Sequence, residues 1–236
     1  MLTGTLPAAV RPRWSPDGDR ILFEAEGHVF VSEVKSGVQR DVGAGALGRW
    51  LGDGCQVLLD RGQTLVAVDA WTGSESASCL SQEPRWGLAL SPDGAVAAFV
   101  VAEPSGGKVR FLDLMTQETW EANASGEVWP PSLAWSPDGR FLAYLVGGAR
   151  TERGQAAAVW VVDRSGSPVA EFSIITDRRF AGMAWSPDSR AAAVSGRASG
   201  GMGVFAVLAV DLSGEAHRLT GTGNCVLPDW GPARRK

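Results

Sequence analysis

The sequence predicts an all-β protein, a β-propeller built from four-stranded antiparallel blades. A turn-forming pentapeptide recurs along the 236-residue chain at intervals of 36, 40, 45, 50 and 45 residues. Spacing of this size is typical of propeller blades. Between the copies, the apolar residues form short runs rich in branched and aromatic side chains, such as residues 141–145. Runs of this length and composition favour strands over helices.

The pentapeptide, Trp-Ser-Pro-Asp-Gly in its fullest form, has the chemistry of a tight turn. Proline presets φ, aspartate bonds to nearby amides, and glycine tolerates positive φ. The indole offers a large apolar surface to bury between blades. We therefore interpret the aspartates as structural turn formers rather than catalytic acids or metal ligands. They are Asp17, Asp53, Asp93, Asp138 and Asp188.

Each pentapeptide is followed by two apolar runs and a weaker third, which with the segment before the tryptophan makes four strands per repeat. The second run closes on an acid that leads into a turn, as in Asp211-Leu212-Ser213-Gly214. We expect residues 1–236 to form a single propeller domain. The repeats cover about 10–45, 46–85, 86–130, 131–180 and 181–224, with a partial sixth at 225–236.

The partial repeat leaves the number of blades open between five and six. Residues 226–232 copy the V-x-P-x-W-x-P spacing of residues 10–16, so they are predicted to form another first strand. Three arrangements fit: five blades with an extra strand, an incomplete six-bladed ring that uses residues 1–6 as its last strand, or completion by another chain. An unclosed ring would expose strand edges, which proteins normally protect.

On these repeats, residues 10–232 resemble the WD-like propellers of the TolB type, which are related to the propeller domains of prolyl-oligopeptidase-like peptidases. The resemblance implies a propeller fold and, as one function, a platform that binds proteins in a bacterial envelope. It also implies enzymatic roles, because such repeats serve as gates of peptidases and in some lyases. Function therefore has to be argued from the site.

Composition excludes several classes of protein. The net charge of −4 and pI near 5.3 give no basic field for nucleic acid, and no apolar run is long enough to span a bilayer.

The sequence shows no export signal at residues 1–10, so the expected location is periplasmic if a signal was removed and otherwise cytoplasmic. The cysteines Cys55 and Cys79 are expected to be buried free thiols.

Catalytic motifs give no positive signal. No GxSxG nucleophile elbow is present, and residues 43–48 match GxGxxG but lead into a strand rather than a helix. His28 and His217, the two histidines, do not have metal-ligand spacing. We therefore predict a protein that is not an enzyme, with no catalytic residue, no metal site and no cofactor.

Length variation among the repeats points to a binding face. The additional residues fall between the second and third strands of repeats three to five. Insertions in repeat proteins map to loops on one face. These hairpins share a face with the connections between repeats, and both carry arginine and aromatic residues, which concentrate binding energy at interfaces. The predicted rim consists of Arg85, Trp86, Lys108, Trp129, Arg150, Arg153, Arg178, Arg179, Phe180 and Arg197.

The favoured function is a non-catalytic scaffold that binds a protein or peptide of acidic character through this rim. Ordinary solvated loops are the simpler interpretation of the same residues, with nearby acids as local partners. A propeller could also be the gating domain of a peptidase-like or lyase-like enzyme. A third option is that it holds carbohydrate or another small ligand in its channel, where Trp86 or Trp129 would stack on a sugar.

Overall fold

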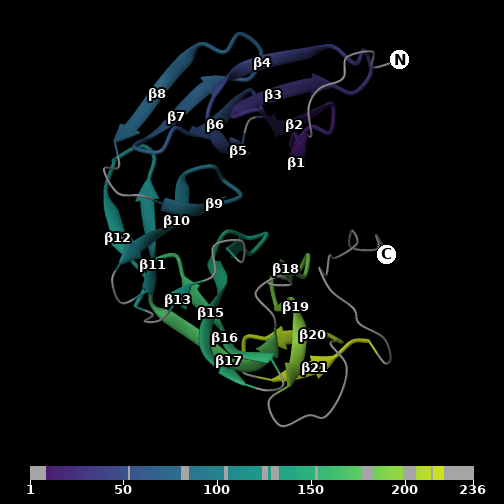
Figure 1. Ribbon diagram of the computed structural model, residues 1–236, viewed down its shortest axis with the longest axis vertical. Coiled ribbons are helices and arrows are strands. Elements are labelled where there is room, and N and C mark those ends of the chain that lie inside the picture. Colours follow the sequence, from purple (N-terminus) through teal and green to yellow (C-terminus); the bar gives the residue numbers. More distant parts are fainter. Residues whose placement is uncertain are drawn as a thin grey trace. The chain divides into compact units, whose positions relative to one another are not determined.

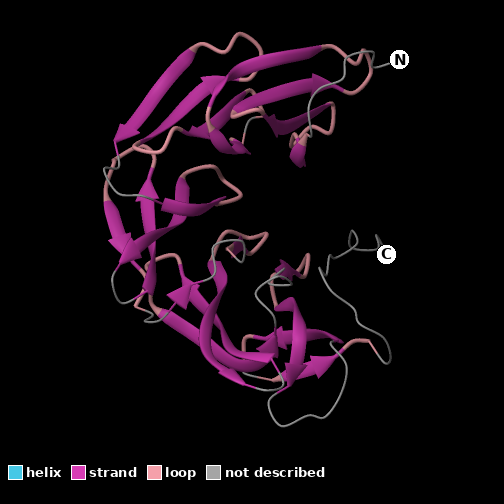
Figure 2. Ribbon diagram, in the orientation of Figure 1, coloured by secondary structure: helices cyan, strands magenta, loops and turns pink. Residues whose placement is uncertain are grey.

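In the computed structural model, every regular element among the described residues is a β-strand (Figure 2). The structure describes residues 9–52, 54–80, 85–103, 106–123, 127–128, 133–151, 154–176, 183–198, 206–213 and 215–220. Within them, no helix is long and apolar enough to cross a membrane. The chain divides into two compact units, Met1–Pro84 and Arg85–Lys236, which are described separately below.

Unit one contains two four-stranded antiparallel sheets in which sequential strands are neighbours (Figure 1). Blade one consists of β1 (Val10–Trp14), β2 (Arg20–Ala25), β3 (His28–Glu33) and β4 (Gln39–Ala44). Blade two consists of β5 (Ala46–Trp50), β6 (Gln56–Asp60), β7 (Thr64–Asp69) and β8 (Glu75–Leu80). The blades approach closely at Gly48, where an added Cβ would lie 3.0 Å from Leu22 Cδ2.

Unit two contains three further blades with the same strand order. Blade three consists of β9 (Arg85–Leu90), β10 (Val96–Glu103), β11 (Gly106–Asp113) and β12 (Thr119–Glu121). In blade four, β13 (Glu127–Val128) and β14 (Ala134–Trp135) both pair with β15 (Phe141–Thr151), followed by β16 (Gly154–Asp163) and β17 (Pro168–Thr176). Blade five consists of β18 (Met183–Trp185), β19 (Ala191–Ala198), β20 (Ala206–Asp211) and β21 (Ala216–Arg218). The predicted fold class is confirmed, with five four-stranded antiparallel blades in the described residues. The terminal repeat at 225–236 lies outside them.

Tryptophan side chains tie successive blades together inside each unit. The indole Nε1 of Trp50 donates to the Arg13 carbonyl at 3.1 Å, and Trp185 donates to the Ala134 carbonyl at 2.9 Å. Trp135 donates in the same way to Ala89, at 3.3 Å. Each acceptor is the residue just before the pentapeptide of the preceding blade, so the same bond recurs with the repeat.

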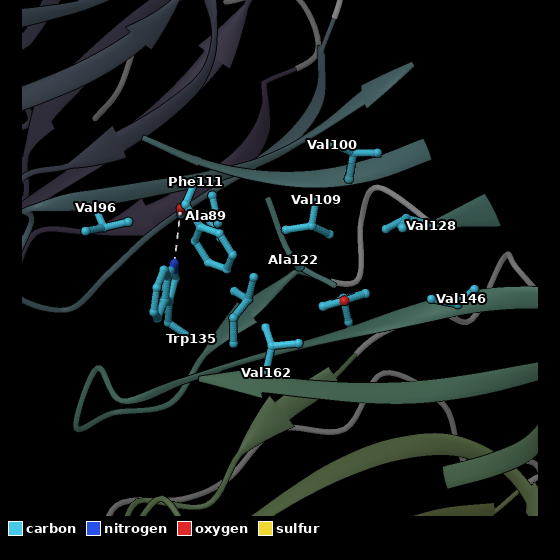
Figure 3. Packing of buried hydrophobic residues seen from close by; sticks show 13 residues of the cluster. Ala89, Val96, Val100, Val109, Phe111, Ala122, Val128, Trp135, Val146 and Val162 are labelled. Carbon is cyan, nitrogen blue, oxygen red and sulfur yellow. Dashed lines mark hydrogen bonds between the residues drawn. The ribbon is translucent and has the colours of Figure 1, made fainter. Parts of the chain in front are cut away.

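An apolar cluster of 13 buried residues lies between blades three and four in the described part of unit two (Figure 3). The Phe111 ring stacks on Trp120, with centroids 5.4 Å apart, and meets the edge of Trp135 at 5.8 Å. Val96 and Val162 close the same cluster from opposite blades. The indole therefore contributes both apolar surface and a hydrogen bond to the blade interface.

Two expectations about local structure are corrected. The added length in repeats three and four extends the strands, because β15 and β16 pair as far as Thr151 and Gly154 and β10 pairs with β11 as far as Glu103 and Gly106. The extra residues thus form hydrogen-bonded ladders, not loops. Cys55 is exposed rather than buried, because it falls in the turn before β6 instead of within the strand.

Candidate functional site

The structure describes only part of the predicted rim. Arg85, Trp86 and Lys108 lie in blade three. Arg150 and Arg197 lie on β15 and β19, where the backbone alone is described. The remaining rim residues, Trp129, Arg153, Arg178, Arg179 and Phe180, fall outside the described residues.

Strand pairing gathers the three described rim residues at one end of blade three. Val101 on β10 pairs with Arg85 on β9 and with Lys108 on β11, so these residues form one row across the sheet. Trp86 is next to this row and is 49% exposed. Arg85 is only 7% exposed, with its guanidinium carbon 5.7 Å from the centroid of the Phe99 ring. Trp86 is therefore on the surface, whereas Arg85 belongs to the packed interior of the blade.

Lys108 is neutralised by its neighbours. Its Nζ lies 3.3 Å from Glu103 Oε1 and 3.4 Å from Glu121 Oε2, and these contacts raise its pKa. Arg110 Nη2 donates to Glu121 Oε1 at 2.6 Å, and this hydrogen bond holds the pKa of Glu121 below its ordinary value. The two cations and two carboxylates balance, so this network of four side chains carries no net charge.

The turn aspartates accept hydrogen bonds from their own turns. In the first repeat, Asp17 accepts from the Ser15 hydroxyl, the Asp19 amide and Arg20, which lowers its pKa to about 2. The serine is buried, and its Oγ accepts the amide of Arg20 at 2.9 Å, which closes the turn onto β2.

The same serine and aspartate contacts recur in three other repeats, at Asp93, Asp138 and Asp188. Asp53 lies outside the described residues. The sequence analysis assigned roles to the proline, aspartate and glycine of this turn but not to the serine. The serine occurs in each of these four copies of the pentapeptide, and this recurrence could have indicated its structural role.

The acids that close the third strands form a second set of turn acceptors. Asp69 and Asp113 each accept the amides two and three residues further on, and these bonds lower their pKa values. Asp211 in blade five has a similar role, and its carboxylate, that of Glu215 and the imidazole of His217 have ligand atoms within 4.8 Å of one another. Exposed groups of this kind are common without a metal, and no other feature of the described residues marks this one as an ion site.

An open depression of about 440 Å³ lies on blade four, between its pentapeptide turn and the hairpin that joins β16 to β17. Asp138, Arg140 and Arg164 line it. Arg164 donates to Asp93 at 2.7 Å, and the guanidinium carbon of Arg140 lies 5.1 Å from the centroid of the Phe141 ring. Both arginines are therefore engaged in contacts with other protein side chains.

A charged cluster that sequence reasoning missed lies in unit one. Arg11 on β1 forms an ion pair of 2.8 Å with the buried carboxylate of Glu24 on β2, and the charge of that carboxylate also acts on Arg13 on β1 and Arg49 on β5. The sequence could have indicated this cluster, because an arginine precedes the tryptophan of the pentapeptide in the first two repeats only.

Comparisons with known proteins agree with this architecture. No family model matches the sequence, and no curated protein matches it. Hydrazine synthase from Kuenenia stuttgartiensis is 19% identical with a TM-score of 0.66, covering 92% of this chain and 67% of that one. A putative TolB from Agrobacterium tumefaciens is 16% identical with a TM-score of 0.60, covering 93% and 83%. An oligogalacturonate lyase in complex with manganese is 16% identical with a TM-score of 0.65, covering 90% and 65%.

The blades and these likenesses together define an all-β propeller with the TolB-type fold. The resemblance inferred from the repeated pentapeptide is confirmed at the level of the fold. The similar structures include a lyase and a synthase as well as a TolB protein. One propeller architecture therefore serves several activities in these neighbours.

Proposed function

We propose that this protein is a non-catalytic propeller that binds a protein or peptide partner through the loop face of repeats three to five. The half-exposed indole of Trp86 carries the proposal, because it lies at one end of blade three beside a balanced ion-pair network. Exposed tryptophans flanked by polar groups are typical anchors of protein interfaces.

The paired strands of blades four and five support this function by giving the described residues next to the proposed face a hydrogen-bonded framework. The strands of blade four pair out to Thr151, and β17 continues onto β19 of the next blade through the pairs Ile174–Ala198 and Ile175–Arg197. Thr176 Oγ1 also donates to the Ser195 carbonyl at 2.7 Å. A rigid surface loses little conformational entropy when a partner docks.

The partner's charge preference has to come from side chains other than Lys108. That lysine is held by Glu103 and Glu121, so a preference for an acidic partner rests on the other rim arginines, of which those at 153, 178 and 179 are chosen for reversal. Reversal of these arginines and removal of the Trp86 indole therefore test two separate parts of the proposal.

The test is affinity capture from a lysate of the source organism, followed by affinity measurement with the identified, purified partner. The variants are Trp86→Ala and the triple reversal of Arg153, Arg178 and Arg179 to Glu, with Trp71→Ala as a matched control because Trp71 is an exposed tryptophan of unit one. Loss of a hot-spot indole is expected to weaken binding roughly thirtyfold. A partner held equally by all four proteins, or no specific partner at all, would contradict the proposal.

A lyase is the second candidate, favoured by the likeness to oligogalacturonate lyase. The test is to incubate the purified protein with oligogalacturonate and Mn²⁺ and to follow the unsaturated product by its ultraviolet absorbance. Turnover above a protein-free control would favour the enzyme, whereas no turnover together with a captured partner would favour the binding scaffold.

A further inference from the structure

The first strand of blade three contains a bulge next to Trp86. Leu88 pairs with Phe99 and Trp86 pairs with the following residue, Val100, so Gly87 is an extra residue on β9. Its φ of +64° lies in the left-handed region that glycine adopts without strain. Bulges of this kind re-aim a neighbouring side chain. Here that side chain is the indole of Trp86, which is 49% exposed.

The same bulge occurs in the first strands of blades one and two. Its extra residues there are Arg11, with a φ of 54°, and Leu47, with a φ of 52°. The residues before them, Val10 and Ala46, are also exposed. The bulge therefore belongs to the repeat, and blade three uses it to expose a tryptophan where the first two blades expose small aliphatic side chains.

Trp86 lies on the apolar face of its blade. Side chains of paired residues share a face of the sheet, and successive residues along a strand alternate between faces. The row of Trp86 continues through Val100 and Val109, which are buried in the cluster between blades three and four. Figure 3 shows both valines, with Val128, at the end of this cluster away from Val96. The indole thus continues a buried apolar row to the surface.

The charged residues at this end of blade three belong to the opposite face. Arg85 and Lys108 both pair with Val101, which follows Val100 on β10 and so points the other way. The ion pairs of Lys108 are therefore made on the face that Trp86 does not share.

The next row on the face of Trp86 is also uncharged. It contains Ala102 on β10, which is exposed, and Gly107 on β11. An added Cβ at Gly107 would lie 2.6 Å from Val100 Cγ1 and 3.6 Å from Val128 Cβ, so this row packs closely against apolar side chains. Among the described positions, neither row places a polar side chain other than the indole N–H on this face.

The indole N–H of Trp86 is available to a ligand. The N–H groups of Trp50, Trp135 and Trp185 each donate to a carbonyl of the preceding blade. That of Trp86 forms no hydrogen bond with the described part of the chain. The exposed indole therefore offers a flat apolar ring and one donor, and it offers no charge.

We propose that Trp86 anchors an uncharged apolar segment of the peptide partner, with an aliphatic, aromatic or prolyl side chain packed on the indole and a backbone carbonyl accepting its N–H. This inference rests on the proposed binding function and specifies the partner's chemistry at Trp86. Apolar burial scales with area, whereas attraction between exposed charges is screened by salt. Binding at Trp86 is therefore insensitive to ionic strength. A sugar fits less well, because its hydroxyls need polar partners that these rows lack.

The test is selection of peptides from a random dodecapeptide library displayed on phage, with the immobilised full chain as the target. We expect the selected peptides to be enriched in aromatic, aliphatic or prolyl residues and not in aspartate or glutamate. Synthetic copies are then titrated calorimetrically. They are expected to bind Trp86→Ala at least about tenfold more weakly than the unmodified protein. Their affinity should change by less than about twofold between roughly 50 and 500 mM NaCl.

Two further variants act as controls. Trp86→Phe keeps an aromatic ring and loses the N–H, so it is expected to bind the peptides with intermediate affinity. Trp71→Ala removes an exposed tryptophan of unit one and is expected to bind them normally. Equal weakening by Trp71→Ala would show adsorption to exposed indoles in general and would overturn the assignment.

The remaining outcomes separate this inference from the proposed function. Selection of acidic peptides, loss of Trp86-dependent affinity at high salt, or saturable binding of maltohexaose that Trp86→Ala abolishes would overturn the apolar anchor and leave a binding face in place. Failure to select any peptide would overturn the anchor as well. Peptide binding that neither Trp86→Ala nor the triple arginine reversal changes would contradict the binding face itself.

Discussion

At the scale of single residues, glycine sets how closely blade four approaches blade three. Gly166 has a φ of +86°, and an added Cβ would lie 2.5 Å from the Glu121 carbonyl oxygen. Its own carbonyl accepts the amide of Asn123 at 3.0 Å. A side chain here meets backbone on the neighbouring blade, which has little freedom to move aside.

Gly166→Ala is therefore expected to lower the free energy of unfolding by roughly 2–4 kcal/mol, combining positive-φ strain with overpacking. Gly18→Ala is the matched control, because Gly18 also has a positive φ of +75° but nothing within 4 Å of an added Cβ. Its cost is expected to be about 1 kcal/mol. Urea denaturation of both variants measures the difference, and equal costs would argue against the close approach.

The ionisation of the turn aspartates makes the free energy of unfolding depend on pH in the acid range. Burial tends to raise the pKa of Asp93, but hydrogen bonds from Ser91, Arg164 and the Ala95 amide outweigh it and lower the pKa to about 2. Asp17 has a similar value. Because these pKa values are below the unfolded value of about 3.9, the ionised carboxylates stabilise the fold above that pH, and the contribution is lost as pH falls towards 2.

We expect the free energy of unfolding to decrease as pH is lowered from about 5 to 2. Asp93→Asn should reduce the slope over this interval, because the side chain no longer titrates and the ion pair with Arg164 is lost. The measurement is urea denaturation at a series of pH values. A slope unchanged by the substitution would mean that Asp93 does not contribute to the acid sensitivity.

At the scale of elements, the repeated indole hydrogen bond joins the first strands of neighbouring blades. Trp135→Phe removes the N–H that reaches the Ala89 carbonyl and leaves most of the apolar surface in place. We expect a loss of roughly 1–2 kcal/mol in the free energy of unfolding, because a buried carbonyl loses its donor. Trp71→Phe, at an exposed tryptophan, should cost less than about 0.5 kcal/mol. Similar costs at both positions, measured by urea denaturation, would contradict a specific role for the bond.

The elements also show where sequence patterns succeed. The pentapeptide locates each turn because its serine, aspartate and glycine make contacts within six residues. The added length of repeats three and four was expected to form loops, yet it forms strands, because β15 and β16 pair as far as Thr151 and Gly154, with one register shift between Gly147 and Arg150. The sequence of one strand alone does not indicate how far it will pair with its neighbour.

At the scale of the whole molecule, stability depends on tightly packed apolar clusters within each unit. Leu59 is fully buried in the cluster of unit one with Leu22, Val57 and Val66. Natural domains are stable by only about 5–15 kcal/mol, so one cavity in such a cluster is a large fraction of the total. The core of each unit is therefore sensitive to single substitutions.

Leu59→Ala is expected to lower the free energy of unfolding by about 2–5 kcal/mol. Leu219→Ala, at an exposed leucine, is the matched control and should change it by less than about 0.5 kcal/mol. Denaturation in urea, monitored by tryptophan fluorescence, gives both values. A small effect at Leu59 would mean that the cluster readily collapses around the missing side chain.

The sequence by itself determined the all-β class and the pentapeptide turns, because each depends on residues close together in the chain. Only the tertiary structure decided the surroundings of the charged residues. It buried Arg85 beside Phe99, neutralised Lys108 with Glu103 and Glu121, and joined Arg164 of blade four to Asp93 of blade three. The reason is physical: the charge and exposure of a side chain depend on neighbours that strand pairing and blade packing bring from distant positions in the sequence.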